Sequence, residues 1–143
     1  MPAHTVSRVL GLDFGTTNSV AALSLGGGEP RLIEFGAPGN ASVDVFRSAL
    51  CFWQDDAVSG GQSVEAGPWA IAEYLAFPQD SRFIQSFKSV AASASFEHAS
   101  IFERRFRFEE LGRIFLDRLR RHTGDALATR PDRVIVGRPV VYA

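Results

Sequence analysis

Two short apolar runs separated by a polar turn constrain the fold of this chain more than any other feature. Val9–Phe14 and Val20–Leu25 have the composition of buried strands, and Gly15–Ser19 between them consists of residues that favour turns. Because so short a connection has no room for a crossover helix, the two strands should pair in antiparallel fashion. The sequence therefore predicts a β-hairpin with a polar tip.

The tip of this predicted hairpin carries residues that can bind phosphate. Asp13 ends a buried strand, Gly15 lets a ligand approach the backbone closely, and Thr16, Thr17 and Asn18 offer consecutive N–H groups and polar side chains. Such a turn can form an anion-binding nest, and a carboxylate beside phosphate suits Mg²⁺ held through water. The alternative is an ordinary hairpin turn. The patterns of the P-loop and the dinucleotide fingerprint are both absent.

The rest of the chain predicts further strands and helices. Strands are expected at Pro30–Phe35, Phe46–Trp53, Ile101–Phe108 (exposed) and Asp132–Val136 (buried). Helices are expected from Pro68 to Pro78, at Ser81–Val90 and at Glu109–Thr123. Gly36–Asp44 is expected to be a loop, and Gln54–Gly67 a turn or hairpin.

Composition and charge narrow the class of protein. The chain has 143 residues, a net charge of −1 and 45% hydrophobic residues, which suits one folded domain without overall attraction to nucleic acid or anionic lipid. The single cysteine, Cys51, excludes an intrachain disulfide and favours a reducing compartment. Neither a secretory signal nor a membrane-length apolar run is visible. A cytoplasmic protein with neither a membrane nor a nucleic-acid partner is expected.

The segment Gly11–Ser19, which reads Gly-Leu-Asp-Phe-Gly-Thr-Thr-Asn-Ser, resembles the first phosphate motif of the actin/sugar-kinase/heat-shock ATPase superfamily. It is most similar to DnaK-type heat-shock chaperones of the seventy-kilodalton class, especially their YegD-type branch. Later segments resemble family segments in the same order. Phe46–Trp53 resembles the family's strand that carries Thr-Pro-Ser, and Phe83–Val90 resembles the segment that holds its catalytic Lys. Arg133–Tyr142 is similar to the strand written Val-Ile-Thr-Val-Pro-Ala-Tyr-Phe in the chaperones. Arg47 stands where the chaperones have Pro.

The resemblance implies roles for individual residues. Asp13 matches the acid that orders the water shell of Mg²⁺. The residues that match the turn holding the β- and γ-phosphates of ATP or ADP are Gly15, Thr16, Thr17 and Asn18. Lys88, the only Lys of the chain, matches the catalytic Lys that reaches the γ-phosphate, and the alternative is a solvated charge on a helix. These residue types suit phosphoryl transfer, which depends on positioning and charge neutralisation.

The resemblance also implies an α/β fold, the ribonuclease-H-like lobe of an actin-like ATPase, with a mixed sheet, flanking helices and a small inserted α+β subdomain. Residues 1–38 and 124–143 would build the lobe, and residues 39–123 the insertion that carries Lys88. The second phosphate motif and the adenosine-binding glycines are missing, so the domain is expected to be incomplete and inactive alone. ATP hydrolysis is expected of a longer chaperone, with client proteins or co-chaperones as partners. The alternatives are a sugar or acyl kinase of the same superfold and a non-catalytic remnant that binds partners.

Overall fold

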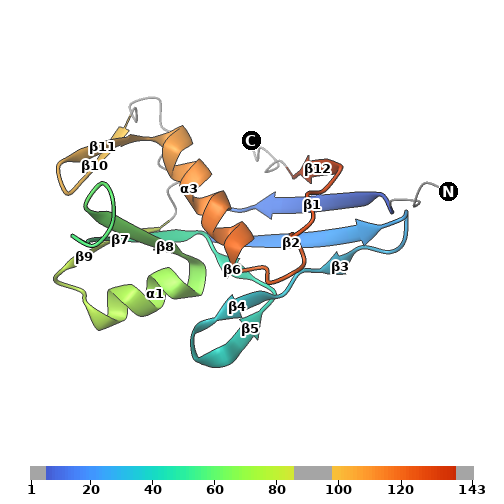
Figure 1. Cartoon of the computed structure of the whole chain (residues 1–143), viewed down its shortest axis with the longest axis horizontal. Coiled ribbons are helices and arrows are strands. Elements are labelled where there is room, and N and C mark those ends of the chain that lie inside the picture. The colour runs from blue at the N-terminus through green and yellow to red at the C-terminus, as the bar shows by residue number, and fades with distance from the viewer. Residues whose placement is uncertain (1–5, 86–97, 138–143) are drawn as a thin grey trace, which may run out of the picture.

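The computed structural model describes residues 6–85 and 98–137, which form a mixed α/β fold with few helices (Figure 1). Lys88 lies outside the described residues, so its placement stays a prediction. In the described part of the chain, no helix is long and apolar enough to cross a membrane.

The main sheet is built around the first hairpin. β1 (Arg8–Phe14) pairs in antiparallel fashion with β2 (Asn18–Leu25), which confirms the predicted hairpin. β2 also pairs with β3 (Arg31–Leu32) and with β6 (Phe46–Arg47). β12 (Arg133–Val136) lies on the other side of β1 and runs parallel to it, so the sheet is mixed (Figure 1).

Smaller sheets and two helices accompany the main sheet. The helices are α1 (Gly67–Ala76), which has Pro68 in its first turn and ends before Pro78, and α3 (Phe108–Arg121). One small sheet consists of β7 (Ala49–Gln54), β8 (Gln62–Ala66) and β9 (Ser81–Gln85). The others are the pair β4 (Phe35–Ala37) and β5 (Ala41–Val43), joined by the short helix η1 (Pro38–Asn40), and the pair β10 (His98–Ile101) and β11 (Arg104–Arg107).

Aromatic side chains join α3 to the main sheet. The rings of Phe14 and Phe115 stack with their centroids 5.1 Å apart, and the Phe46 ring lies 5.8 Å from that of Phe115. Leu111, Phe115 and Leu119 repeat at helical spacing and are buried, as the sequence predicts for this helix. Gly67 is required beneath this core because a Cβ there would overlap the Phe46 ring. Phe14 and Phe46 thus mark the face of the sheet that α3 covers, and the other face points away from α3.

The helix predicted over Ser81–Val90 is wrong in its described part. Ser81–Gln85 forms β9, in which Phe83 and Ile84 stand opposite Cys51 and Leu50 of β7. The apolar spacing fits one face of a helix, but β7 offers a strand edge whose backbone groups need partners, and that pairing prevails.

Two predicted strands are broken and one predicted loop is ordered. Pro30–Phe35 divides between β3 and β4, and the region expected to be a loop, Gly36–Asp44, belongs largely to the β4–β5 hairpin. Phe46–Trp53 divides at Ser48 into β6 and β7. The apolar residues of β7 are buried on both faces, because α1 packs on one side and the Phe106 ring lies 5.2 Å from that of Phe52.

Burial differs from the prediction at three further elements. β12 was expected to be buried, but Val134, Ile135 and Val136 are 52–58% exposed, because no described strand pairs with the outer edge of β12. The stretch expected to be one exposed strand forms the β10–β11 hairpin, with Ile101 and Phe106 buried. In α1, Gly67 and Ala70 are buried while the predicted apolar stripe leaves Leu75 exposed.

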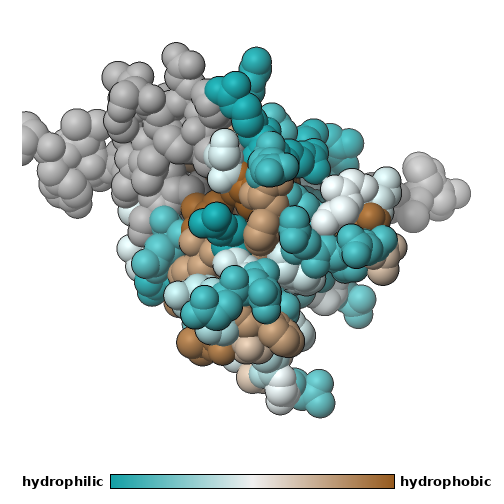
Figure 2. Space-filling view, turned by 90° about the vertical axis from the view of Figure 1, so that its left-hand side faces the viewer, coloured by the Kyte–Doolittle hydropathy of each residue, from teal (hydrophilic) through white to brown (hydrophobic). Residues whose placement is uncertain are grey.

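Figure 2 views the end of the molecule that carries α1 and shows apolar surface among the hydrophilic residues there.

Candidate functional site

The tip of the first hairpin is a tight turn. The N–H of Gly15 donates a hydrogen bond of 3.0 Å to the carbonyl oxygen of Asn18. A Cβ on residue 15 would lie 2.5 Å from that oxygen, so only glycine fits without moving the backbone. The close approach of the chain to itself therefore explains the glycine in the motif.

Ser48, at the break between β6 and β7, holds the turn from the neighbouring strand. Its N–H donates to the carbonyl oxygen of Thr17 at 2.8 Å, and its Oγ donates to the carbonyl oxygen of Gly15 at 2.7 Å. The same Oγ lies 2.9 Å from the Oγ of Ser19, and both serines are buried. Buried hydroxyls need hydrogen-bond partners, and this network fixes the shape of the turn through them. No local pattern in the sequence predicts this role of Ser48, because it depends on the pairing of β6 with β2.

The upper side of the turn has polar groups without partners. Thr16, Thr17 and Asn18 are exposed. Within the described residues, no hydrogen bond engages their side chains or the N–H groups of Thr16 and Thr17. Successive N–H groups that a turn leaves without protein acceptors can bind an anion. The structure thus places the predicted phosphate-binding residues on one turn, which Ser48 holds in shape and in which their polar side chains are exposed.

Asp13 lies beside this turn, on the face of the sheet opposite α3. Successive side chains of a strand alternate between faces, and its neighbour Phe14 packs on α3 through Phe115. Asp13 is exposed and has no ion pair or hydrogen bond from its carboxylate within the described residues. Because its carboxylate is unpaired, Asp13 is free to face a ligand.

The parallel strands β1 and β12 end together at the same edge of the sheet. The N–H of Gly137 donates to the carbonyl oxygen of Leu12 at 2.8 Å, and a Cβ on Gly137 would lie 3.9 Å from Oδ1 of Asp13. The edge formed by the carboxyl ends of parallel strands is where open α/β sheets bind ligands. Asp13 and the hairpin tip therefore lie in a favourable position for a site.

The described residues include no cluster of three or more His, Cys, Asp or Glu side chains that could hold a metal ion. Mg²⁺ keeps several waters and binds through one or two carboxylates together with phosphate oxygens, so it needs no such cluster. A single carboxylate at Asp13 fits that requirement when phosphate supplies further ligands. The residues present are compatible with the predicted role of Asp13.

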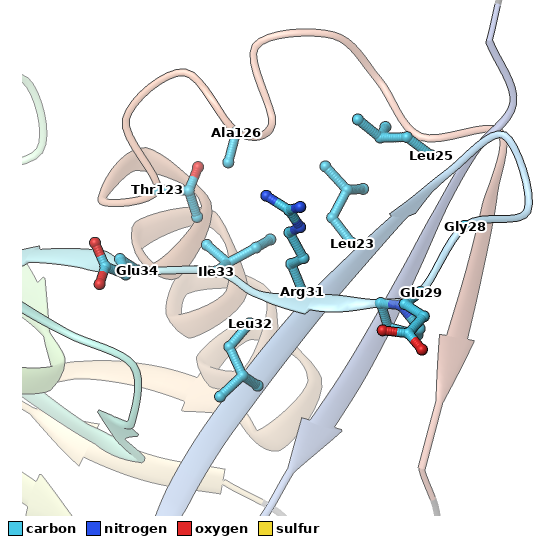
Figure 3. A pocket seen from close by; sticks show the side chains of 11 residues that line it. Leu23, Leu25, Gly28, Glu29, Arg31, Leu32, Ile33, Glu34, Thr123 and Ala126 are labelled. Carbon is cyan, nitrogen blue, oxygen red and sulfur yellow. The ribbon is translucent and has the colours of Figure 1, made fainter.

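A hollow of about 790 Å³ lies elsewhere, between β2, β3 and the segment after α3. Figure 3 shows Arg31 extending into this hollow below Ala126, with Leu23 and Ile33 beside it. Glu29 and Glu34 also line it, and none of the residues of the hairpin tip does. The hollow is a separate surface with mixed charges and no grouping of residues that suggests a reaction.

Cys51 is buried in β7, and this burial raises the pKa of its thiol. A raised pKa leaves little of the reactive thiolate at neutral pH. The candidate site therefore remains the hairpin tip with Asp13.

No protein-family model matches this chain, and a search of curated proteins finds no match.

Proposed function

We propose that this chain binds the phosphate groups of ATP together with Mg²⁺, as the first lobe of an actin-like ATPase of the DnaK chaperone type. The observation that carries the proposal is the state of the polar groups at the tip. The motif Gly11–Ser19 forms a turn that Ser48 holds from the neighbouring strand, while the N–H groups and hydroxyls of Thr16 and Thr17 have no partner among the described residues. Because exposed groups of any turn can bond to water, it is the place of these groups in the phosphate-like motif that points to phosphate.

Each residue of the tip has a role in this proposal. Thr16, Thr17 and Asn18 donate hydrogen bonds to phosphate oxygens, and Gly15 allows the close turn that presents them. Asp13 accepts hydrogen bonds from the water shell of Mg²⁺. When bound, Mg²⁺ neutralises charge on the phosphate chain. Lys88 is the proposed catalytic residue at the γ-phosphate.

The finer fold assignment, a ribonuclease-H-like lobe with an inserted subdomain, is part of the proposal. The mixed sheet with β12 parallel to β1 is compatible with it. The β7–β9 sheet, α1 and the β10–β11 hairpin all fall within residues 39–123 and lie beside the main sheet (Figure 1). ATP hydrolysis and client binding belong to a longer chaperone in this proposal, and the lobe alone binds nucleotide without turnover.

An NMR titration of the 143-residue chain with Mg²⁺-ATP tests the proposal. We expect saturable shifts of the backbone amide signals of Gly15–Ser19, because ligand binding changes the surroundings of these N–H groups. The amides of β8, Gln62–Ala66, are the internal control and should stay in place. Thr17→Val keeps the shape of the side chain and removes its hydroxyl, so it should lower the affinity for Mg²⁺-ATP. Turn signals that stay unshifted at saturating Mg²⁺-ATP would refute the proposed function.

A further inference from the structure

A positive charge stands beside the hairpin tip that neither the motif nor the proposed function explains. Arg47 of β6 is directly opposite Asn18 of β2 in the antiparallel register, and Phe46 is opposite Ser19. Residues directly opposite each other in such a pair project from the same face, with their Cβ atoms about 5 Å apart. Arg47 and Asn18 are therefore neighbours on one face of the sheet.

This face is the one that carries Asp13. Phe46 packs toward α3, with its ring 5.8 Å from that of Phe115, so the next residue, Arg47, points to the opposite face. The same alternation places Asp13 there, because Phe14 stacks on Phe115. Asp13, Asn18 and Arg47 thus lie on the face away from α3, where Asp13 is opposite Val20 and Arg47 is opposite Asn18, so they form a diagonal row across β1, β2 and β6.

The guanidinium of Arg47 has no carboxylate partner within the described residues. Its hydrogen bond there joins Nη2 to Oε1 of Gln85 at 3.4 Å, which is long and involves a neutral amide. Most of its N–H donors therefore remain available. A guanidinium binds phosphate with paired, charge-assisted hydrogen bonds that are stronger than this contact.

We propose that Arg47 binds the phosphate chain of the ligand from the β6 side, while Asp13 holds the hydrated Mg²⁺ from the β1 side. This inference rests on the proposed function and narrows its ligand. Asp13 and Arg47 are separated by two interstrand spacings and by an offset of two residues along the strands, about 12 Å in total between Cα atoms. A ligand that engages both ends of the row carries a polyphosphate chain, so nucleoside di- and triphosphates bind better than monophosphates.

The test compares Arg47→Ala with a matched control, Arg31→Ala, in the 143-residue chain. Arg31 is exposed and lies in β3 at the hollow shown in Figure 3. Its replacement by Ala removes the same charge as Arg47→Ala but at a distance from the hairpin tip. In titrations followed by the amide signals of Gly15–Ser19, Arg47→Ala should weaken Mg²⁺-ATP binding about tenfold, as expected for loss of charge-assisted hydrogen bonds. Arg31→Ala should change the affinity less than twofold. Arg47→Met, which keeps the apolar stem, provides the same comparison if the alanine variant folds poorly.

A second ligand separates a contact with the phosphate chain from a contact with the nucleoside. Mg²⁺-pyrophosphate lacks the nucleoside, so Arg47→Ala should weaken its binding by about the same factor as that of Mg²⁺-ATP. A normal affinity of Arg47→Ala for both ligands would overturn the role of Arg47 and leave the proposed function standing. Absence of any binding by the unmodified chain would overturn the proposed function and this inference together.

Discussion

The hairpin tip and the junction between α3 and β8 differ in how far their polar groups are paired within the protein. At the junction, Nε2 of His122 lies 2.8 Å from Oε2 of Glu65, and Nη1 of Arg118 lies 3.5 Å from Oε1 of the same carboxylate. The His122 ring stacks on Trp69 at 5.1 Å, and the Trp69 Nε1–H donates to the carbonyl oxygen of Gly36. The polar groups of the junction satisfy one another.

At the tip, the polar groups are divided between two purposes. Ser19 and Ser48 are buried and bonded to each other and to the turn, whereas the hydroxyls of Thr16 and Thr17 and the Asp13 carboxylate have no partners among the described residues. Groups that are paired within the protein stabilise the fold, and exposed groups left unpaired are available to a ligand. The comparison predicts that substitutions at the junction lower the free energy of unfolding without changing ligand binding. At the tip, it predicts that substitution of a buried residue lowers stability and substitution of an exposed residue weakens binding.

The largest effect is expected at the buried side of the tip. Ser48→Ala removes the donor to Gly15 and leaves the Ser19 hydroxyl without its partner, so we expect a loss of about 2 kcal/mol in the free energy of unfolding. Urea denaturation followed by circular dichroism measures it. The control is Ser24→Ala, whose hydroxyl donates to Gly28 in an exposed turn and whose loss should cost less than about 0.5 kcal/mol. Equal losses in the two variants would contradict the role given to Ser48.

The junction should respond in stability and not in binding. Glu65→Ala removes the partner of both His122 and Arg118, whose side chains are partly buried, and we expect a loss of about 1.5 kcal/mol in the free energy of unfolding. Glu34→Ala is the matched control, because Glu34 is exposed and has no ion pair in the described part of the chain. Affinity for Mg²⁺-ATP, measured by the NMR titration, should be the same in both variants. Weaker nucleotide binding by Glu65→Ala alone would remove the distinction between the two regions.

The smallest effect in energy is expected at Asp13, where the change should appear in binding alone. Asp13→Asn removes an exposed charge that has no partner among the described residues, so the free energy of unfolding should stay within about 0.5 kcal/mol of its original value. The affinity for Mg²⁺-ATP should fall by about 1 kcal/mol, roughly fivefold, because the amide orders the metal's water shell less strongly. With the metal chelated, ATP should bind at least as well as before, since a negative charge is gone. An equal loss with and without Mg²⁺ would show that Asp13 does not act through the metal.

The local pattern of the sequence was enough to predict the first hairpin and helix α3. Two apolar runs around a polar turn leave few alternatives to a hairpin, and the spacing of Leu111, Phe115 and Leu119 requires a helix that buries one side. The clustering of Gly15, Thr16, Thr17 and Asn18 was equally predictable, because residues adjacent in a tight turn are adjacent in space. The register of the hairpin, which pairs Asp13 with Val20, then places Asp13 and Asn18 on the same face.

Only the tertiary structure decided the partners that come from distant parts of the chain. Ser48 reaches the turn because β6 pairs with β2, and that same pairing places Arg47 opposite Asn18. β9 forms in place of a helix because the edge of β7 is available, and β12 is exposed because no described strand covers its outer edge. Local propensity determines elements whose stabilising contacts lie within a few residues. Strand pairing depends on backbone groups far apart in the sequence, and these carry no side-chain signature of their partner.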